Sequence, residues 1–98
     1  MFDVDTGMVE KSFLITSINA LGNMKTHEAC KRLTLYLELL HSFTEKEHVY
    51  DEQIVLAVIY ALGHIGDRTA SSALIYTRYL DYSKMVKKAA KDALQELD

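Results

Sequence analysis

A chain of 98 residues with 49% apolar and 26% charged residues has the composition of one globular domain rather than of a disordered segment. The net charge of −3 argues against nucleic acid as the main partner, because proteins that bind nucleic acid usually carry a basic surface. A single cysteine excludes an internal disulfide framework and a cysteine-rich metal site. The chain has no proline and only four glycines, which favours helices joined by short turns.

The N-terminal sequence MFDVDTGMVE is acidic and lacks the apolar core of a signal peptide. The longest apolar run extends from Ile54 to Leu62 and is far shorter than the ~20 residues that a membrane-spanning helix needs. We therefore expect a cytoplasmic protein that makes no contact with a membrane. The lone cysteine fits a reducing compartment.

The start and stop signals predict an all-α protein of five helices and no strand. The first helix is expected over 8–22, with Gly22-Asn23 as its C-terminal stop. Suitable N-caps precede each of the following helices: Thr26, Asp51, Asp67 and Ser83. The predicted ranges of these four helices are 27–41, 52–63, 68–80 and 84–97. A longer linker, 41–52, is expected between the second helix and the third.

The sequence also repeats itself. A shift of 41 positions aligns 12–40 with 53–81 and places Ala20-Leu21-Gly22 on Ala61-Leu62-Gly63. A shift of 32 positions aligns 53–65 with 85–97. We therefore expect a single domain over residues 1–98 whose repeat units lie at about 8–41, 51–81 and 84–97, the first and last of them incomplete.

The segment ALGHIGDRTASSALIYTRYLDYSKMVKKAAKDAL resembles the HEAT repeat family, in its short bacterial form related to phycobilisome-lyase repeats. Residues 61–67 match the family pattern Ala-Leu-Gly-x-Ile-Gly-Asp, and Asp81 with Val86-Lys87 matches the next junction, with lysine in place of arginine. The resemblance covers about residues 8 to 97, although the usual turn proline is absent. It implies a right-handed α-solenoid of antiparallel helices, with the first, third and fifth helices on the inner side. On this basis we expect the chain to be a fragment of a longer solenoid.

Comparison of the repeats separates two kinds of apolar position in the third helix. Six positions stay apolar in the fifth helix and are expected to form the core: Ile54, Ala57, Val58, Ala61, Leu62 and Ile65. At the other four, the fifth helix carries Lys87, Lys88, Lys91 and Asp92, so the fold does not require apolar side chains there. With their counterparts in the first helix, these positions form a predicted protein-interaction face: Leu14, Ile15, Ile18, Val55, Leu56, Ile59 and Tyr60.

Two explanations of this predicted face remain open. It contacts another protein or a second copy of the chain in a homodimer, because large exposed apolar patches often mark interfaces. Alternatively, neighbouring helices or the 41–52 linker cover it with side chains such as Phe43, Val49 and Tyr50.

No residue pattern indicates catalysis or a bound cofactor. The pairs His27-Glu28 and Glu47-His48 are similar to the His-Glu pairs with which one HEAT-type enzyme, deoxyhypusine hydroxylase, binds iron, but Arg68-Thr69 stands at the equivalent place in the next repeat. A lysine stripe in the last helix is partly neutralised by Asp92. We therefore predict a non-catalytic protein–protein interaction module or scaffold with no metal and no cofactor. The alternative implied by the resemblance is an accessory or lyase-like protein that handles a cofactor or a modified protein substrate.

Overall fold

The computed structural model describes the backbone of residues 2–97 and the side chains of residues 10–97, and within this range the chain forms helices and turns only. The helices are α1 (Phe2–Met24), α2 (His27–Glu47), α3 (Glu52–Ile65), the short 3-10 turn η1 (Arg68–Ala70), α4 (Ser71–Thr77) and α5 (Lys84–Gln95). The prediction of an all-α chain with five α-helices is therefore confirmed for the described residues.

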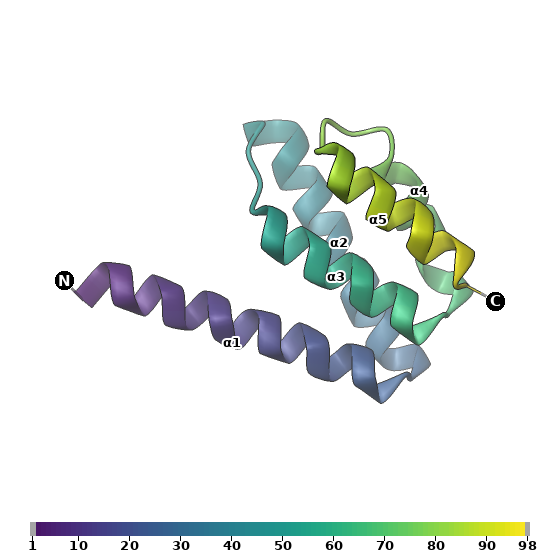
Figure 1. The fold of residues 1–98 in the computed structure, drawn as a ribbon, viewed down its shortest axis with the longest axis horizontal. Helices are drawn as coiled ribbons and strands as arrows, with labels where there is room; N and C mark the ends of the chain where they lie inside the picture. The colour runs from purple at the N-terminus through teal and green to yellow at the C-terminus, as the bar shows by residue number, and fades with distance from the viewer. Residues whose placement is uncertain (1, 98) are drawn as a thin grey trace.

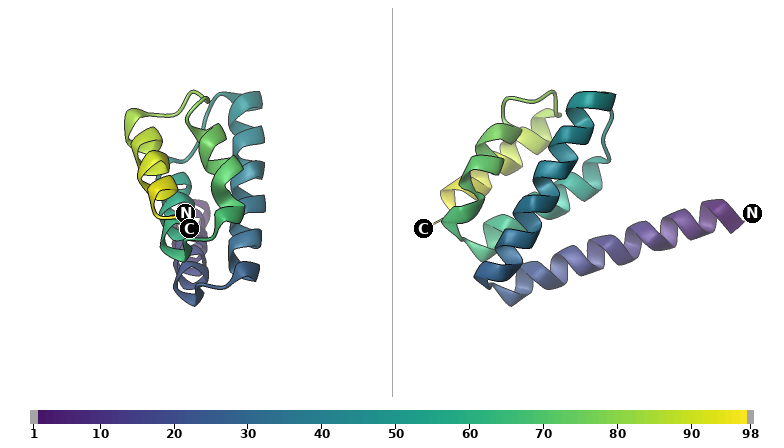
Figure 2. Two further views of the ribbon diagram at one scale, coloured as in Figure 1. Left: turned by 90° about the vertical axis from the view of Figure 1, so that its right-hand side faces the viewer. Right: turned by 180° about the vertical axis from the view of Figure 1, so that it is seen from behind.

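The helices pack in two layers (Figure 1). One layer contains α1, α3 and α5, and α3 lies in its middle, in contact with both neighbours. The second layer contains α2 and α4, which lie behind the first (Figure 2). The N-terminal half of α1 projects beyond the other helices (Figure 1). Because α3 also touches α2, it is surrounded by protein on three sides.

The predicted N-caps are all confirmed. The side chains of Thr26, Asp51, Asp67 and Ser83 each accept a hydrogen bond from a backbone amide two or three residues further along the chain. Each bond satisfies one of the amides that has no partner inside its own helix. Short polar side chains at these positions therefore determine where the helices begin.

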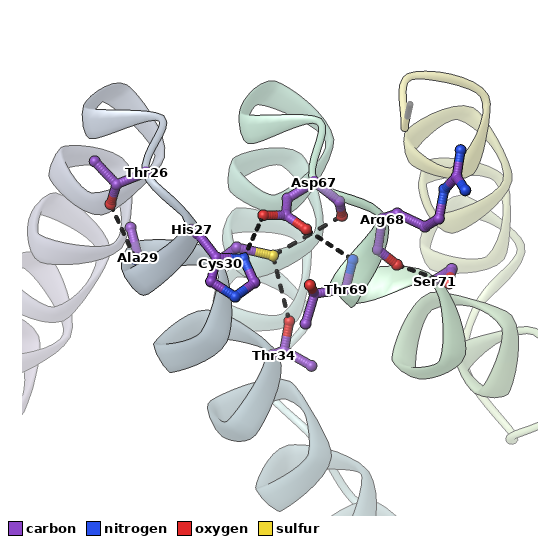
Figure 3. A network of polar contacts seen from close by, with 9 residues as sticks. All are labelled: Thr26, His27, Ala29, Cys30, Thr34, Asp67, Arg68, Thr69 and Ser71. Atoms are coloured by element: carbon purple, nitrogen blue, oxygen red, sulfur yellow. Dashed lines mark hydrogen bonds and ion pairs between the residues drawn. The ribbon is translucent and has the colours of Figure 1, made fainter.

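Two of these caps lie next to each other where α2 and η1 begin (Figure 3). One carboxylate oxygen of Asp67 accepts from the Thr69 amide at 2.8 Å, and the other lies 2.7 Å from Nδ1 of His27. The hydrogen bond from His27, followed by that from Thr69, holds the pKa of Asp67 at about 2. Asp67 thus joins the start of α2 to the turn that precedes α4.

Several predicted helix boundaries are wrong. Gly22-Asn23 does not end α1, which continues to Met24 before Lys25 adopts a left-handed conformation with φ 52°. The second helix does not end at 41 but continues to Glu47, so most of the predicted linker is helical. The fourth helix was predicted over 68–80, but it starts as 3-10 and ends at Thr77, where a turn follows.

A buried polar cluster explains why α2 is longer than predicted. His41 is 2% exposed and lies between α2 and α4. Its Nε2 donates to the carbonyl oxygen of Ala73 at 3.0 Å, so Nδ1 is free to accept from the hydroxyl of Tyr82 at 2.8 Å. Thr44, one turn further along α2, is also buried and lies 3.1 Å from the same hydroxyl. Because these contacts need another turn of packed helix, tertiary structure extends α2 past residue 41.

Candidate functional site

The layer of α1, α3 and α5 contains two close glycine–alanine contacts between neighbouring helices. A Cβ atom placed on Gly22 of α1 would lie 2.9 Å from the Cβ of Ala61, and one placed on Gly63 of α3 would lie 3.0 Å from the Cβ of Ala93. Both distances are shorter than the ~3.5–4.0 Å at which carbon atoms make favourable contact. Gly22 and Gly63 therefore allow a close approach of neighbouring helices rather than ending them.

These contacts show which side of α3 faces which neighbour. Ala61 faces α1, and Gly63 faces α5. Residues four apart lie on the same side of a helix, so Val55 and Ile59 share the side of Gly63 and face α5. Both are fully buried. The apolar side chains around α3 are thus explained by its position between two helices.

The predicted interaction face is therefore wrong for three of its seven residues. Ile18, Val55 and Ile59 are at most 2% exposed and belong to the core. In α5, the positions that correspond to Val55 and Ile59 are Lys87 and Lys91. This side of α5 faces away from α3, so the charged side chains on it remain hydrated. The expected core is confirmed for Val58, Ala61 and Leu62, which are buried, whereas Ile54, Ala57 and Ile65 are only partly buried.

The other four predicted residues remain accessible to different degrees. Leu14, Ile15 and Leu56 are partly buried, and Tyr60 is 58% exposed. Tyr50, in the loop after α2, is one of the side chains expected to cover them. Tyr50 instead packs edge-on against Tyr82, with ring centroids 4.7 Å apart, and its hydroxyl accepts from the Ser83 amide at 2.8 Å.

Tyr60 stands between two shallow grooves. The groove between α1 and α3 has a volume of about 390 Å³ and is lined by Asn19, Asn23 and His64 together with Tyr60. It continues towards the start of α3, where Ile15, Gln53 and Leu56 line a further hollow. The groove between α3 and α5 has a volume of about 380 Å³ and is lined on its far side by Asp92, Gln95 and Glu96. The small residues of the glycine–alanine contacts lie at the bottom of both grooves.

We call the accessible side chains around these grooves the Tyr60 face: Ile15, Asn19, Asn23, Gln53, Leu56, Tyr60, His64, Asp92 and Gln95. Only three of them were predicted from the sequence, because the comparison of repeats selected apolar positions. The four amide side chains were missed. A signal was available, since Asn19 and Asn23 are spaced by one helical turn in an otherwise apolar segment.

The Tyr60 face carries uncharged amide side chains on α1 and charged side chains on α5, where Asp92 and Glu96 line the same groove as Tyr60. Amide side chains both donate and accept hydrogen bonds. On α5, Lys88 Nζ lies 2.9 Å from the carboxylate of Asp92, and this bond raises the pKa of Lys88. In the described part of the chain, no three His, Cys, Asp or Glu side chains lie close enough together to hold a metal ion.

The single cysteine lies elsewhere, in the core. Cys30 is fully buried, and burial raises the pKa of its thiol. Its sulfur lies 3.8 Å from the hydroxyl of Thr34 (Figure 3). A buried thiol with a raised pKa is a weak nucleophile, because the thiolate is the reactive form.

Comparisons of the chain with protein-family models, with curated proteins and with solved structures gave no match. Among residues 2–97, no helix combines the length and the hydrophobicity that crossing a membrane requires.

Proposed function

We propose that this chain is a non-catalytic protein–protein interaction module built of HEAT-like repeats, and that its Tyr60 face binds an extended segment of another protein. The observation that carries the proposal is the position of Tyr60, which is 58% exposed on the middle helix of its layer, between two grooves. Tyrosine is enriched among the residues that dominate binding energy, because its ring offers a large rigid surface and its hydroxyl a hydrogen bond.

Two recurring features support the repeat interpretation. The left-handed residues Lys25 and Gly66 are related by the 41-residue shift of the sequence, and each is followed by a capping side chain, Thr26 or Asp67. The close glycine–alanine contact also occurs twice, once between α1 and α3 and once between α3 and α5. Stacked repeats present equivalent helices side by side, and solenoid proteins use such surfaces for binding.

The side chains around Tyr60 favour an extended peptide as the ligand. A peptide backbone offers alternating N–H donors and C=O acceptors, and an Asn or Gln amide can pair with both. Asn19 and Asn23 lie on one wall of the α1–α3 groove, and Gln53 lies further along it. Ile15 and Leu56 add an apolar contact for one side chain of the ligand. An extended segment lying along the α1–α3 groove would use all of these groups.

A library of random peptides displayed on phage and selected against the immobilised protein tests this proposal. We expect peptides that bind the wild-type protein and bind Tyr60→Ala at least about tenfold more weakly, as expected for a dominant contact. In NMR spectra, a selected peptide should shift the side-chain amide signals of Asn19, Asn23 and Gln53.

The matched control is Tyr79→Ala, because Tyr79 is 79% exposed but lies after α4, away from the Tyr60 face. This variant should bind the selected peptides as the wild type does. Failure to select any peptide, or peptides that bind Tyr60→Ala and the wild type equally well, would show that the Tyr60 face is not a peptide-binding surface.

A further inference from the structure

Large exposed apolar side chains follow one side of α2. Leu35, Leu39 and Phe43 are spaced by four residues and are 62%, 67% and 52% exposed. Each residue turns the helix by about 100°, so these side chains point away from the side of His41. His41 contacts α4 through the carbonyl of Ala73. The apolar stripe therefore lies on the free side of α2, opposite α4.

The free side of α1 is apolar as well. Gly22 faces α3, and Phe13, Ala20 and Met24 lie roughly opposite Gly22 on the helix. Phe13 is 69% exposed, Met24 is 60% exposed and Ala20 is exposed too. Both α3 and α5 lie on the other side of α1 (Figure 1), so this side of α1 is free, as is the side of α2 that lies opposite α4. We call this surface the α1–α2 end: Phe13, Ala20, Met24, Leu35, Leu39 and Phe43.

The opposite end of the molecule is polar. On α5, Ala93 faces α3, and the residues roughly opposite Ala93 are Lys84, Lys91 and Gln95, all of them exposed. Terminal units of stacked helical proteins need such a polar outer side to remain in solution. The end formed by α5 therefore has the character of a hydrated surface, whereas the α1–α2 end does not.

We propose that the α1–α2 end binds the α1–α2 end of a second copy of this chain, which forms a two-fold symmetric dimer. In head-to-tail stacking, the α1–α2 end of one copy would meet the α5 end of the next. This arrangement is disfavoured, because it would bury Lys84 and Lys91 against apolar side chains without a partner for their charges. A two-fold contact places the same apolar surface on both sides. This proposal does not depend on the Tyr60 face.

The exposed apolar area is large enough for such a contact. Large apolar side chains have surfaces of ~200 Å² each. Five of them, each between 52% and 69% exposed, leave ~600 Å² per copy. Complete burial of all five side chains in both copies would remove at most ~1,200 Å² from solvent, which is the lower limit for a stable interface.

The charges along α2 favour an antiparallel pairing of the two α2 helices. In the sequence, Leu35 and Leu39 are each two residues from Leu37, and Glu28 and Lys46 are each nine residues from Leu37. An antiparallel pair centred on Leu37 therefore brings Leu35 of one copy to Leu39 of the other, and Glu28 of one copy towards Lys46 of the other. Glu28 also lies 3.7 Å from Arg32 of its own helix, and the same arrangement places Lys31 level with Phe43 of the other copy, so the contact is apolar at Leu35 and Leu39 and charged towards both ends.

Sedimentation equilibrium measurements test the proposal. The wild-type chain should be a dimer, and Leu39→Lys should be a monomer with an unchanged circular dichroism spectrum, because Leu39 is already 67% exposed. The matched control is Met85→Lys on α5, where a 57% exposed apolar side chain is replaced at the other end of the molecule, and this variant should remain a dimer.

Charge reversal tests the pairing without touching the apolar side chains. Lys46→Glu, which leaves the Glu28–Arg32 pair of each copy in place, should weaken the dimer about tenfold or more, and the double variant Glu28→Lys/Lys46→Glu should restore it, because the opposite charges then meet again. A wild-type chain that is monomeric at millimolar concentration would overturn the proposal, and so would a Leu39→Lys variant that dimerises like the wild type.

Discussion

Replacement of Gly63 by alanine tests how closely α3 and α5 approach each other. The new Cβ would lie 3.0 Å from the Cβ of Ala93 and 3.1 Å from its Cα, so the two helices would have to separate by ~0.5–1 Å to reach normal contact. Such overpacking costs ~1–3 kcal/mol. Alanine is also a better helix former than glycine by ~0.5–1 kcal/mol. The difference is a net loss of ~0–2.5 kcal/mol in the free energy of unfolding, with a central value of ~1.3 kcal/mol.

Urea denaturation followed by circular dichroism at 222 nm measures this loss, which should lower the melting temperature by roughly 5–10 °C in a domain of this size. The urea midpoint should fall while the slope of the transition stays the same. The double variant Gly63→Ala/Ala93→Gly should recover part of the loss, because it removes the nearer of the two clashing atoms, and the remaining 3.1 Å contact with the Cα should keep the recovery incomplete. A Gly63→Ala variant as stable as the wild type, or more stable, would show that α3 and α5 do not approach this closely.

Two further predictions concern pH. The pKa of His41 is lowered from 6.5, first because burial disfavours the charged imidazole, while the Ala73 carbonyl and the carboxylates of Glu45 and Glu38 oppose this effect only partly. The unfolded chain therefore takes up a proton at residue 41 more readily than the folded chain. The contribution of neutral His41 to the free energy of unfolding should be complete above pH 6.5 and should decrease as the pH falls below 6.5. The decrease in the free energy of unfolding with falling pH, measured by urea denaturation, should be smaller in His41→Gln, and an equal decrease would contradict the assignment. The pKa of Asp67 is lowered to about 2, so Asp67→Ala should melt at a lower temperature than the wild type at pH 7, and the difference should shrink as the pH falls from 4 to 2.

The starts of the four capped helical segments could be predicted from the sequence because capping is a local interaction, whereas α1 begins at Phe2, six residues before its predicted start. Thr26, Asp51, Asp67 and Ser83 each bond to an amide only two or three residues away, and no distant part of the chain is needed. The helix ends were predicted less well. Gly22 looked like a stop signal, yet the helix passes through it, because its missing side chain is used in a contact with Ala61 on another helix.

The repeat pattern located the centre of the candidate site but not its composition. Comparison of the copies correctly placed Tyr60 on an accessible side of α3, whereas Val55 and Ile59 were assigned to the same surface and are fully buried. The reason is that α5 has charged residues at their equivalents, Lys87 and Lys91, and this suggested that the positions are exposed in every copy. In a stack of helices, however, the middle helix has a neighbour on both sides and a terminal helix has a neighbour on only one.

Sequence by itself thus determined the properties that depend on a residue and its neighbours along the chain: helical structure and the four caps. Tertiary structure alone decided which side of each helix meets another helix and which remains free. The exposure of Leu35, Leu39 and Phe43 belongs to this second class, since a stripe of apolar residues four apart normally indicates a buried side. The periodicity of a helix marks an apolar side but does not say whether another helix lies against it, because burial depends on contacts between segments that are far apart in the sequence.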